Sequence, residues 1–174
     1  MVIEPMKCGT EEFEVHLPEE LIAAELEPNR VELPQRTPAE HIRWALDHPV
    51  DSAPLKELVK AGDKVCIVIS DVTRRWQSPE TYIPVLIAEL ESAGIRDEDM
   101  LIISATGTHR RQTPEEHMGL VTKEVYERIE LVDHVCTDEE NLSYVGTTSR
   151  GTPVWLDKRA LACDKIILTG GVVY

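Results

Sequence analysis

Charged and polar side chains directly follow the first long apolar run of the chain. Residues 65–69 are Val-Cys-Ile-Val-Ile, and Asp71, Thr73, Arg74 and Arg75 come after them. The planar guanidinium of Arg74 could hold both oxygens of a carboxylate, and Asp71 could orient that guanidinium or bond to a substrate hydroxyl. On spacing alone, an ordinary salt bridge that ties the loop down explains these residues equally well.

A second polar turn contains a histidine that could transfer protons. The apolar stretch at residues 99–104 ends in a turn that includes Gly107, Thr108, His109 and Arg110. A neutral imidazole at His109 could act as a general base near neutral pH. A histidine bonded only to the backbone of its own loop is an equally open interpretation.

Two more apolar runs end in turns of the same kind. Residues 129–135 end with Asp133 and His134, and residues 165–168 are followed by Thr169-Gly170-Gly171. Because the carboxyl ends of parallel strands lie at one edge of a sheet, these turns could converge in one crevice. The expected members of this crevice are Asp71, Arg74, His109, Arg110 and Gly170.

The remaining charged side chains carry weaker signals. Arg75, Arg110 and Arg111 are typical of solvated loop charges, and His134 beside Asp133 favours a satisfied strand-end histidine over a second acid–base pair. The other histidines fall on helices, an edge strand or exposed turns and indicate no chemistry; they are His16, His41, His48 and His117.

The order of the elements predicts the fold class. The apolar runs are continuous, as in strands that are buried on both faces, and they alternate with helical segments. Two of these helical segments begin with a Thr-Pro-x-Glu capping signature, at Thr37 and at Thr113. We expect Ser78 to cap a further helix that ends at Gly94. This alternation predicts a single-domain, Rossmann-like α/β fold with a mostly parallel sheet and helices on both faces.

Two segments are expected to lie outside that parallel sheet. Residues 143–148 and 152–156 resemble a β-hairpin. Residues 1–35 read as an N-terminal edge strand, with period-two alternation at residues 12–17, followed by an acidic irregular segment. We assign them to the same amino-terminal domain, residues 1–174.

Composition excludes several classes of partner. The 174 residues carry a formal net charge of −14, which argues against nucleic acid or an anionic membrane surface. No apolar run is long enough to cross a bilayer, and no signal-peptide pattern opens the chain. The four cysteines are too widely spaced for a zinc site, which fits a reducing cytoplasm; Cys66 and Cys163 read as small core residues.

Several motifs occur together in one order along the chain. They are Asp-x-Thr-Arg at 71–74, Gly-Thr-His-Arg at 107–110 with Thr-Pro-Glu-Glu at 113–116, residues 141–146 with 150–154, and Leu-Thr-Gly-Gly at 168–171. Over residues 40–174 this ordered set resembles the amino-terminal domain of the nickel-dependent lactate racemase family.

The resemblance implies an isomerase that racemises or epimerises a small 2-hydroxy acid. The family uses a nickel-pincer nucleotide that accepts a hydride from the substrate carbon, while a histidine takes the hydroxyl proton. By position, His109 corresponds to the first catalytic histidine, Arg74 to the carboxylate-binding arginine and Asp71 to its neighbouring acid. Further candidate contacts are Thr73, Arg75, Thr108, Arg110, Gly170 and Gly171.

The chain also departs from the family pattern. The second catalytic histidine, the cofactor-bearing lysine and the nickel-ligating histidine are not found, and neither Lys158 nor Lys165 has the right context for that lysine. We therefore expect a truncated domain that lacks the C-terminal part of the same protein, binds neither metal nor cofactor covalently, and is inactive alone. Arg75-Trp76 replaces the usual proline, which suggests a larger or dicarboxylic substrate.

Two alternatives compete with the racemase interpretation. One is a non-catalytic, carboxylate-binding or regulatory α/β domain that keeps the anion site. The other is a hydrolase that pairs His109 with Asp133, which ranks last because no serine or cysteine nucleophile lies in a recognisable turn.

Overall fold

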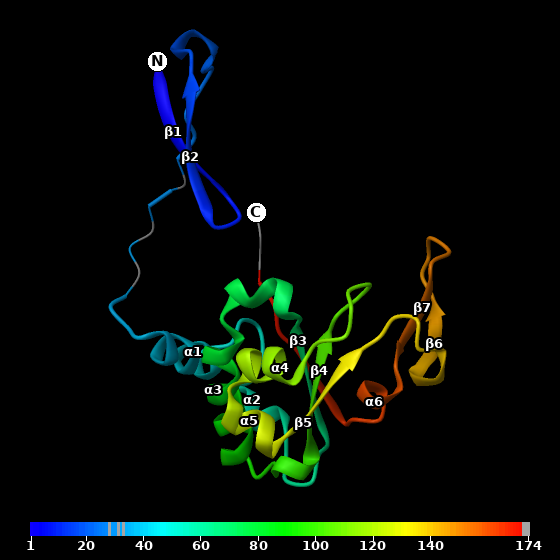
Figure 1. The fold of residues 1–174 in the computed structure, drawn as a ribbon. Helices are drawn as coiled ribbons and strands as arrows, with labels where there is room; N and C mark the ends of the chain where they lie inside the picture. Colours follow the sequence, from blue (N-terminus) through cyan, green and yellow to red (C-terminus); the bar gives the residue numbers. More distant parts are fainter. Residues whose placement is uncertain (28, 31, 33, 172–174) are drawn as a thin grey trace. The chain divides into compact units, whose positions relative to one another are not determined.

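The chain forms two compact units. The computed structural model describes residues 1–27, 29–30, 32 and 34–171, and the units are Met1–Gln35 and Arg36–Tyr174 (Figure 1). Every residue proposed for chemistry belongs to the second unit.

The first unit is a β-hairpin followed by a short 3-10 helix. Strand β1 (Val2–Cys8) pairs antiparallel with β2 (Glu11–Leu17), and η1 (Glu19–Leu21) follows. The predicted strand at residues 12–17 is confirmed, but its partner is β1 and not a strand of the parallel sheet. Strand β1 was not predicted from the sequence, because Pro5 interrupts it and proline inside a run argues against a strand.

Four parallel strands form the main sheet of the second unit. They are β3 (Val65–Ser70), β4 (Met100–Ala105), β5 (Glu130–His134) and β8 (Lys165–Leu168), in the order β5-β4-β3-β8. The pairings place Val65 opposite Met100 on one side and opposite Lys165 on the other. A central strand is buried on both faces, which explains why β3 reads as a continuous apolar run.

Helices on one side of this sheet share its larger core (Figure 1). They are α1 (Pro38–Asp47), α2 (Leu55–Leu58), α3 (Pro79–Ser92), α4 (Pro114–Val121) and α5 (Lys123–Arg128). The main core includes Val65, Ile67 and Ile69 from alternate positions of β3, together with Ile83 and Leu120 from the helices. The period of two sends every second residue of the strand to this face.

The opposite face carries a smaller core under α6 (Lys158–Leu161). Cys66 of β3 and Ile103 of β4 pack there against Ala160. Helices therefore cover both faces, and the predicted α/β class is confirmed. Ala160 of α6 and Leu168 of β8 line a hollow on this face, and Leu168 is 78% exposed, so α6 leaves part of the face open.

Helix starts follow the capping signatures in two of three cases. Thr37 with Glu40, and Thr113 with Glu116, form complete capping boxes before α1 and α4. The predicted cap at Ser78 is wrong, because its side chain makes no capping bond and its backbone is left-handed, at φ 53°. Ser78 also ends the preceding 3-10 helix η2 (Val72–Gln77), where its N–H donates to the Arg75 carbonyl.

The predicted hairpin after β5 is confirmed. Strand β6 (Leu142–Thr147) pairs antiparallel with β7 (Pro153–Asp157), with a bulge between Tyr144 and Gly146. Two further 3-10 turns, η3 (Asp97–Asp99) and η4 (Glu139–Asn141), precede β4 and β6. Among the described residues, no helix has the length and apolar character needed to cross a membrane.

All four cysteines are free thiols. Cys66 is fully buried, and burial raises the pKa of its thiol to about 12. Cys163 is half-buried and packs against the same smaller core. The prediction that both are small core residues is confirmed.

Truncation of a central core side chain tests this arrangement. Ile67 of β3 is fully buried, and we expect Ile67→Ala to lower the free energy of unfolding by about 2–5 kcal/mol in denaturant titrations. Val50 is 89% exposed, so Val50→Ala serves as the control and should change that free energy by less than about 0.5 kcal/mol. Equal effects of the two substitutions would contradict the central position of β3.

Candidate active site

The turns after β3 and β4 meet at the carboxyl edge of the sheet. The parallel register places Ser70 opposite Ala105, so the residues that follow both strands lie side by side. Nδ1 of His109 lies 2.5 Å from Oδ2 of Asp71. The two residues singled out for chemistry on separate turns therefore form one pair.

Asp71 is held rigidly behind His109. Its side chain is only 4% exposed, and Oδ1 accepts bonds from the Thr73 backbone N–H at 3.1 Å and from the Thr73 hydroxyl at 2.6 Å. Burial alone would raise the pKa of Asp71, but the hydrogen bonds from Thr73 and His109 outweigh burial and lower it. Asp71 is therefore ionised at neutral pH.

The charge on Asp71 decides the tautomer of His109. An ionised carboxylate can only accept, so Nδ1 of His109 carries the proton and donates it, which leaves the lone pair of a neutral ring on Nε2. Half of the His109 side chain is exposed, and none of the described residues bonds to Nε2. The interpretation in which the ring bonds only to its own loop is wrong, although its backbone N–H does donate to Thr106.

Arg74 offers an exposed guanidinium in the same turn. It lies in η2, where its backbone N–H donates to the Asp71 carbonyl at 2.9 Å. Within the described part of the chain, its side chain forms no ion pair, so the alternative in which a salt bridge of Arg74 ties the loop down is wrong. An exposed arginine without a carboxylate partner is suited to bind a small anion.

Other candidate residues serve the structure of the turns. The Arg110 guanidinium donates two hydrogen bonds to the Glu116 carboxylate, at 2.6 and 2.8 Å. These bonds are the main cause that lowers the pKa of Glu116 to about 2. Arg75 lies over Gly119 of α4, where a Cβ on the glycine would approach Nη1 to 3.4 Å. The Thr73 hydroxyl donates to Asp71, and Thr108 lies in the exposed part of the β4 turn.

The glycine turn after β8 lies against η2. A Cβ on Gly171 would come within 2.9 Å of Gln77 Nε2 and 3.0 Å of Trp76 Cη2, so a larger residue would have to displace the ends of these two side chains. Thr169 donates to the Val68 carbonyl at 2.9 Å and thereby ties the turn to β3. Gly170 has open space around it. The third turn thus borders the same edge as Asp71 and Arg74.

A buried polar network beneath the site was not anticipated. Gln112 contacts Asp133, Ser104 and the Val72 backbone, and His117 Nε2 lies 2.8 Å from Asp133 Oδ1. No role was predicted for His117, because a lone histidine on a helix carries no signal. The position of Asp133 at a strand end was the only available hint.

Asp133 and His134 do not act together. Neighbouring strand residues point to opposite faces, and accordingly Asp133 binds His117 whereas Nδ1 of His134 lies 3.3 Å from Asp157. The satisfied strand-end histidine is confirmed. A hydrolase dyad of His109 with Asp133 is wrong, because the two residues have different partners.

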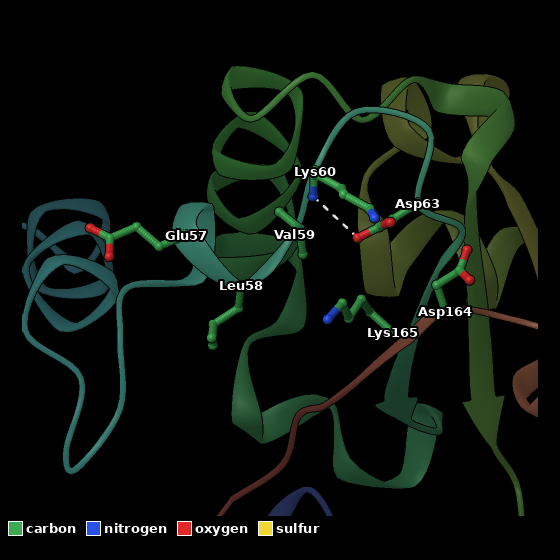
Figure 2. A pocket seen from close by; sticks show the side chains of 7 residues that line it. All are labelled: Glu57, Leu58, Val59, Lys60, Asp63, Asp164 and Lys165. Carbon is green, nitrogen blue, oxygen red and sulfur yellow. Dashed lines mark hydrogen bonds between the residues drawn. The ribbon is translucent and has the colours of Figure 1, made fainter.

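A separate hollow lies at the opposite, amino-terminal edge of the sheet. Figure 2 shows its lining, where the backbone N–H of Lys60 donates to Asp63 at 3.1 Å. Asp164 likewise accepts from the Lys64 backbone at 2.8 Å. These carboxylates stabilise the loops that lead into β3 and β8, so the hollow adds nothing to the candidate site. No cluster of three His, Cys, Asp or Glu side chains suited to a metal ion exists in the described ranges.

The charge on Asp71 makes stability depend on pH. Its folded pKa lies below the ordinary value of 3.8, so the carboxylate stabilises the fold above that pH, and this stabilisation is lost as the pH falls through the folded pKa. We expect Asp71→Asn to lower the free energy of unfolding by about 1–2 kcal/mol at neutral pH.

Denaturant titrations over a pH series measure this difference, which should shrink below about pH 4. Asp47, whose side chain is 53% exposed, provides the matched control, and Asp47→Asn should change stability by less than about 0.5 kcal/mol. A difference for Asp71→Asn that stays constant down to about pH 2 would show that its charge does not matter.

Comparison with known proteins places this chain in a family. The lactate racemase N-terminal domain family matches residues 8–174. The lactate racemase of Lactiplantibacillus plantarum is 31% identical over 131 residues, which cover 75% of this chain and 30% of that protein. The lactate racemase of Thermoanaerobacterium thermosaccharolyticum is 27% identical over 129 residues, with 74% and 30% covered.

Solved structures agree with the fold. The lactate racemase apoprotein from Thermoanaerobacterium thermosaccharolyticum superposes with a TM-score of 0.79 at 25% identity, over 96% of this chain and 38% of that one. A protein from Thermotoga maritima shares the fold, with a TM-score of 0.60 at 23% identity, over 75% and 32%. This chain spans about 30% of the length of the curated relatives. It belongs to the lactate racemase N-terminal domain family.

Proposed function

We propose that the full-length protein interconverts the stereoisomers of a small 2-hydroxy acid of the lactate type. This chain would supply the carboxylate anchor and one catalytic base. The observation that carries the proposal is the Asp71–His109 pair next to the exposed Arg74. Family membership supports it, because two relatives that cover most of this chain are lactate racemases.

Arg74 binds the substrate carboxylate in this proposal. Its guanidinium is free of ion pairs within the described residues and exposed at the sheet edge. Two parallel N–H···O bonds to a carboxylate would fix the orientation of the acid. With the carboxylate held, the neighbouring carbon and its hydroxyl lie at a set distance from the Arg74 turn.

His109 takes the proton of the substrate hydroxyl. Asp71 holds the Nδ1–H, so Nε2 is the basic atom, and Asp71 stabilises the imidazolium after proton transfer. With that proton removed, the hydrogen on the same carbon would pass as a hydride to an acceptor bound elsewhere in the full-length protein, which leaves a planar keto acid. Return of the hydride to the other face, with a proton to the carbonyl oxygen from the second catalytic histidine that the family resemblance implies, would give the opposite isomer.

The hydride acceptor implied by the family resemblance is a nickel-pincer nucleotide. We propose that the full-length protein holds it through residues outside this chain, because neither Lys158 nor Lys165 stands in the sequence context of the family's cofactor lysine. We also propose a cytoplasmic location, which the free cysteines support.

A carboxylate-binding domain without catalysis is the competing proposal. Such a domain needs an arginine like Arg74 but has no use for an exposed imidazole oriented by a buried carboxylate. The Asp71–His109 pair therefore favours the enzyme.

Turnover of single isomers of lactate tests the proposal. The full-length protein, purified with its cofactor, should convert either isomer to the same mixture, as measured by chiral chromatography. The 174-residue chain alone should convert neither. Turnover of lactate by the short chain, or none by the loaded full-length protein, would contradict the proposal.

Substitutions at the site separate binding from proton transfer. In the full-length protein, we expect His109→Gln to lower kcat by about 10²- to 10⁴-fold with little change in KM. Arg74→Gln should instead raise KM strongly, because the carboxylate loses its anchor. Arg150 lies exposed in the β6–β7 turn, so Arg150→Gln is the control for removal of an arginine, and it should leave both constants unchanged.

A further inference from the structure

One glutamine connects the two turns that carry the candidate active site. Oε1 of Gln112 accepts a bond from the backbone N–H of Val72 at 2.7 Å, and Val72 directly follows Asp71. Gln112 itself lies three residues after His109 in the β4 turn. We infer that Gln112 is a positioning residue that keeps Asp71 and His109 aligned. Its consequence for catalysis rests on the proposed function.

Buried partners fix the orientation of the Gln112 amide. Its Nε2 donates to Ser104 Oγ at 2.7 Å and to Asp133 Oδ1 at 2.9 Å, and its backbone N–H donates to Asp133 Oδ2 at 2.8 Å. Ser104 and Asp133 are both buried. Because the Val72 N–H can only donate and an ionised Asp133 can only accept, a flipped amide would lose both bonds.

His117 holds the far side of the network. Its Nε2 lies 2.8 Å from Asp133 Oδ1, and its side chain is buried in α4. Three elements thus meet at Asp133: the β4 turn through Gln112, α4 through His117, and β5, which carries the carboxylate. A buried network whose members are all paired permits one arrangement and penalises others.

Loss of the Gln112 side chain would release the η2 turn on one side. The Val72 N–H is partly buried and would lose its acceptor, and such a group favours a shift toward water or another partner. Any shift of Val72 moves Asp71, whose Oδ2 must stay within bonding distance of Nδ1 of His109. The Asp71–His109 bond is therefore the quantity to measure.

Proton NMR of the 174-residue chain measures that bond without any enzymatic activity. The Nδ1–H of His109 should give a far-downfield resonance, which Asp71→Asn removes and thereby assigns. Gln112→Met keeps the side-chain length without hydrogen-bonding groups, and we expect it to abolish the resonance in a folded protein. Gln35 is exposed, and Gln35→Met should retain the resonance. A resonance unchanged in Gln112→Met would overturn the inference.

If Gln112→Met does not fold, Gln112→Glu tests whether Gln112 keeps Asp71 and His109 aligned. The introduced carboxylate keeps an acceptor for Val72 but lies against the carboxylate of Asp133. The nearby titratable and charged groups are His117 of α4, Asp71 at the start of η2, and Arg159 of α6 at the Asp133 carbonyl. The resonance should be absent at neutral pH and return as the pH falls, because a shared proton restores the donor. A resonance independent of pH would overturn the inference.

Kinetics of the full-length protein separate this inference from the proposed function. Gln112→Met should lower kcat by roughly 10- to 100-fold. KM should change less than kcat, because the Arg74 guanidinium is retained although it belongs to the same η2 turn. If the unsubstituted full-length protein turns over no 2-hydroxy acid, the proposed function fails, and the NMR result alone judges the inference. An active Gln112→Met variant with unchanged kcat would overturn the inference while the proposed function stands.

Discussion

The parallel pairing of β3 with β4 determines where every group of the candidate site lies. With Ser70 opposite Ala105, the residues after each strand begin at the same level of the sheet. The carboxylate of one turn then meets the imidazole of the next at 2.5 Å. A shift of the register by one residue would move Asp71 by about 3.3 Å along the strand and turn its neighbours to the other face.

The buried polar groups beneath the site each require hydrogen-bond partners. A buried carboxylate without hydrogen bonds is destabilising, and each one here has several. Asp71 accepts from Thr73 and His109, and Asp133 accepts from Gln112 and His117. The hydrogen bonds that keep these residues ionised also hold the turns in place, so stability and the proposed catalysis depend on the same contacts.

The elements of the fold were largely predictable because their signals are local. Continuous apolar runs indicated the parallel strands, and two capping boxes indicated helix starts. Where a residue serves two elements, the local signal failed: Ser78 ends η2 and therefore cannot adopt the backbone of a cap for α3. Strand β1 was not predicted, because its pairing with β2 makes it a strand and its own residue pattern does not indicate one.

The candidate site could be proposed from the sequence as a set of residues but not as a set of contacts. By itself the sequence determined the family, the α/β class and the candidate residues Asp71, Arg74 and His109, since motifs and apolar periodicity are properties of short segments. Only the tertiary structure decided that Asp71 binds His109, 38 residues away, instead of Arg74, and that Asp133 binds His117. Hydrogen-bond partners at such separations depend on strand register and turn geometry, which no single segment encodes.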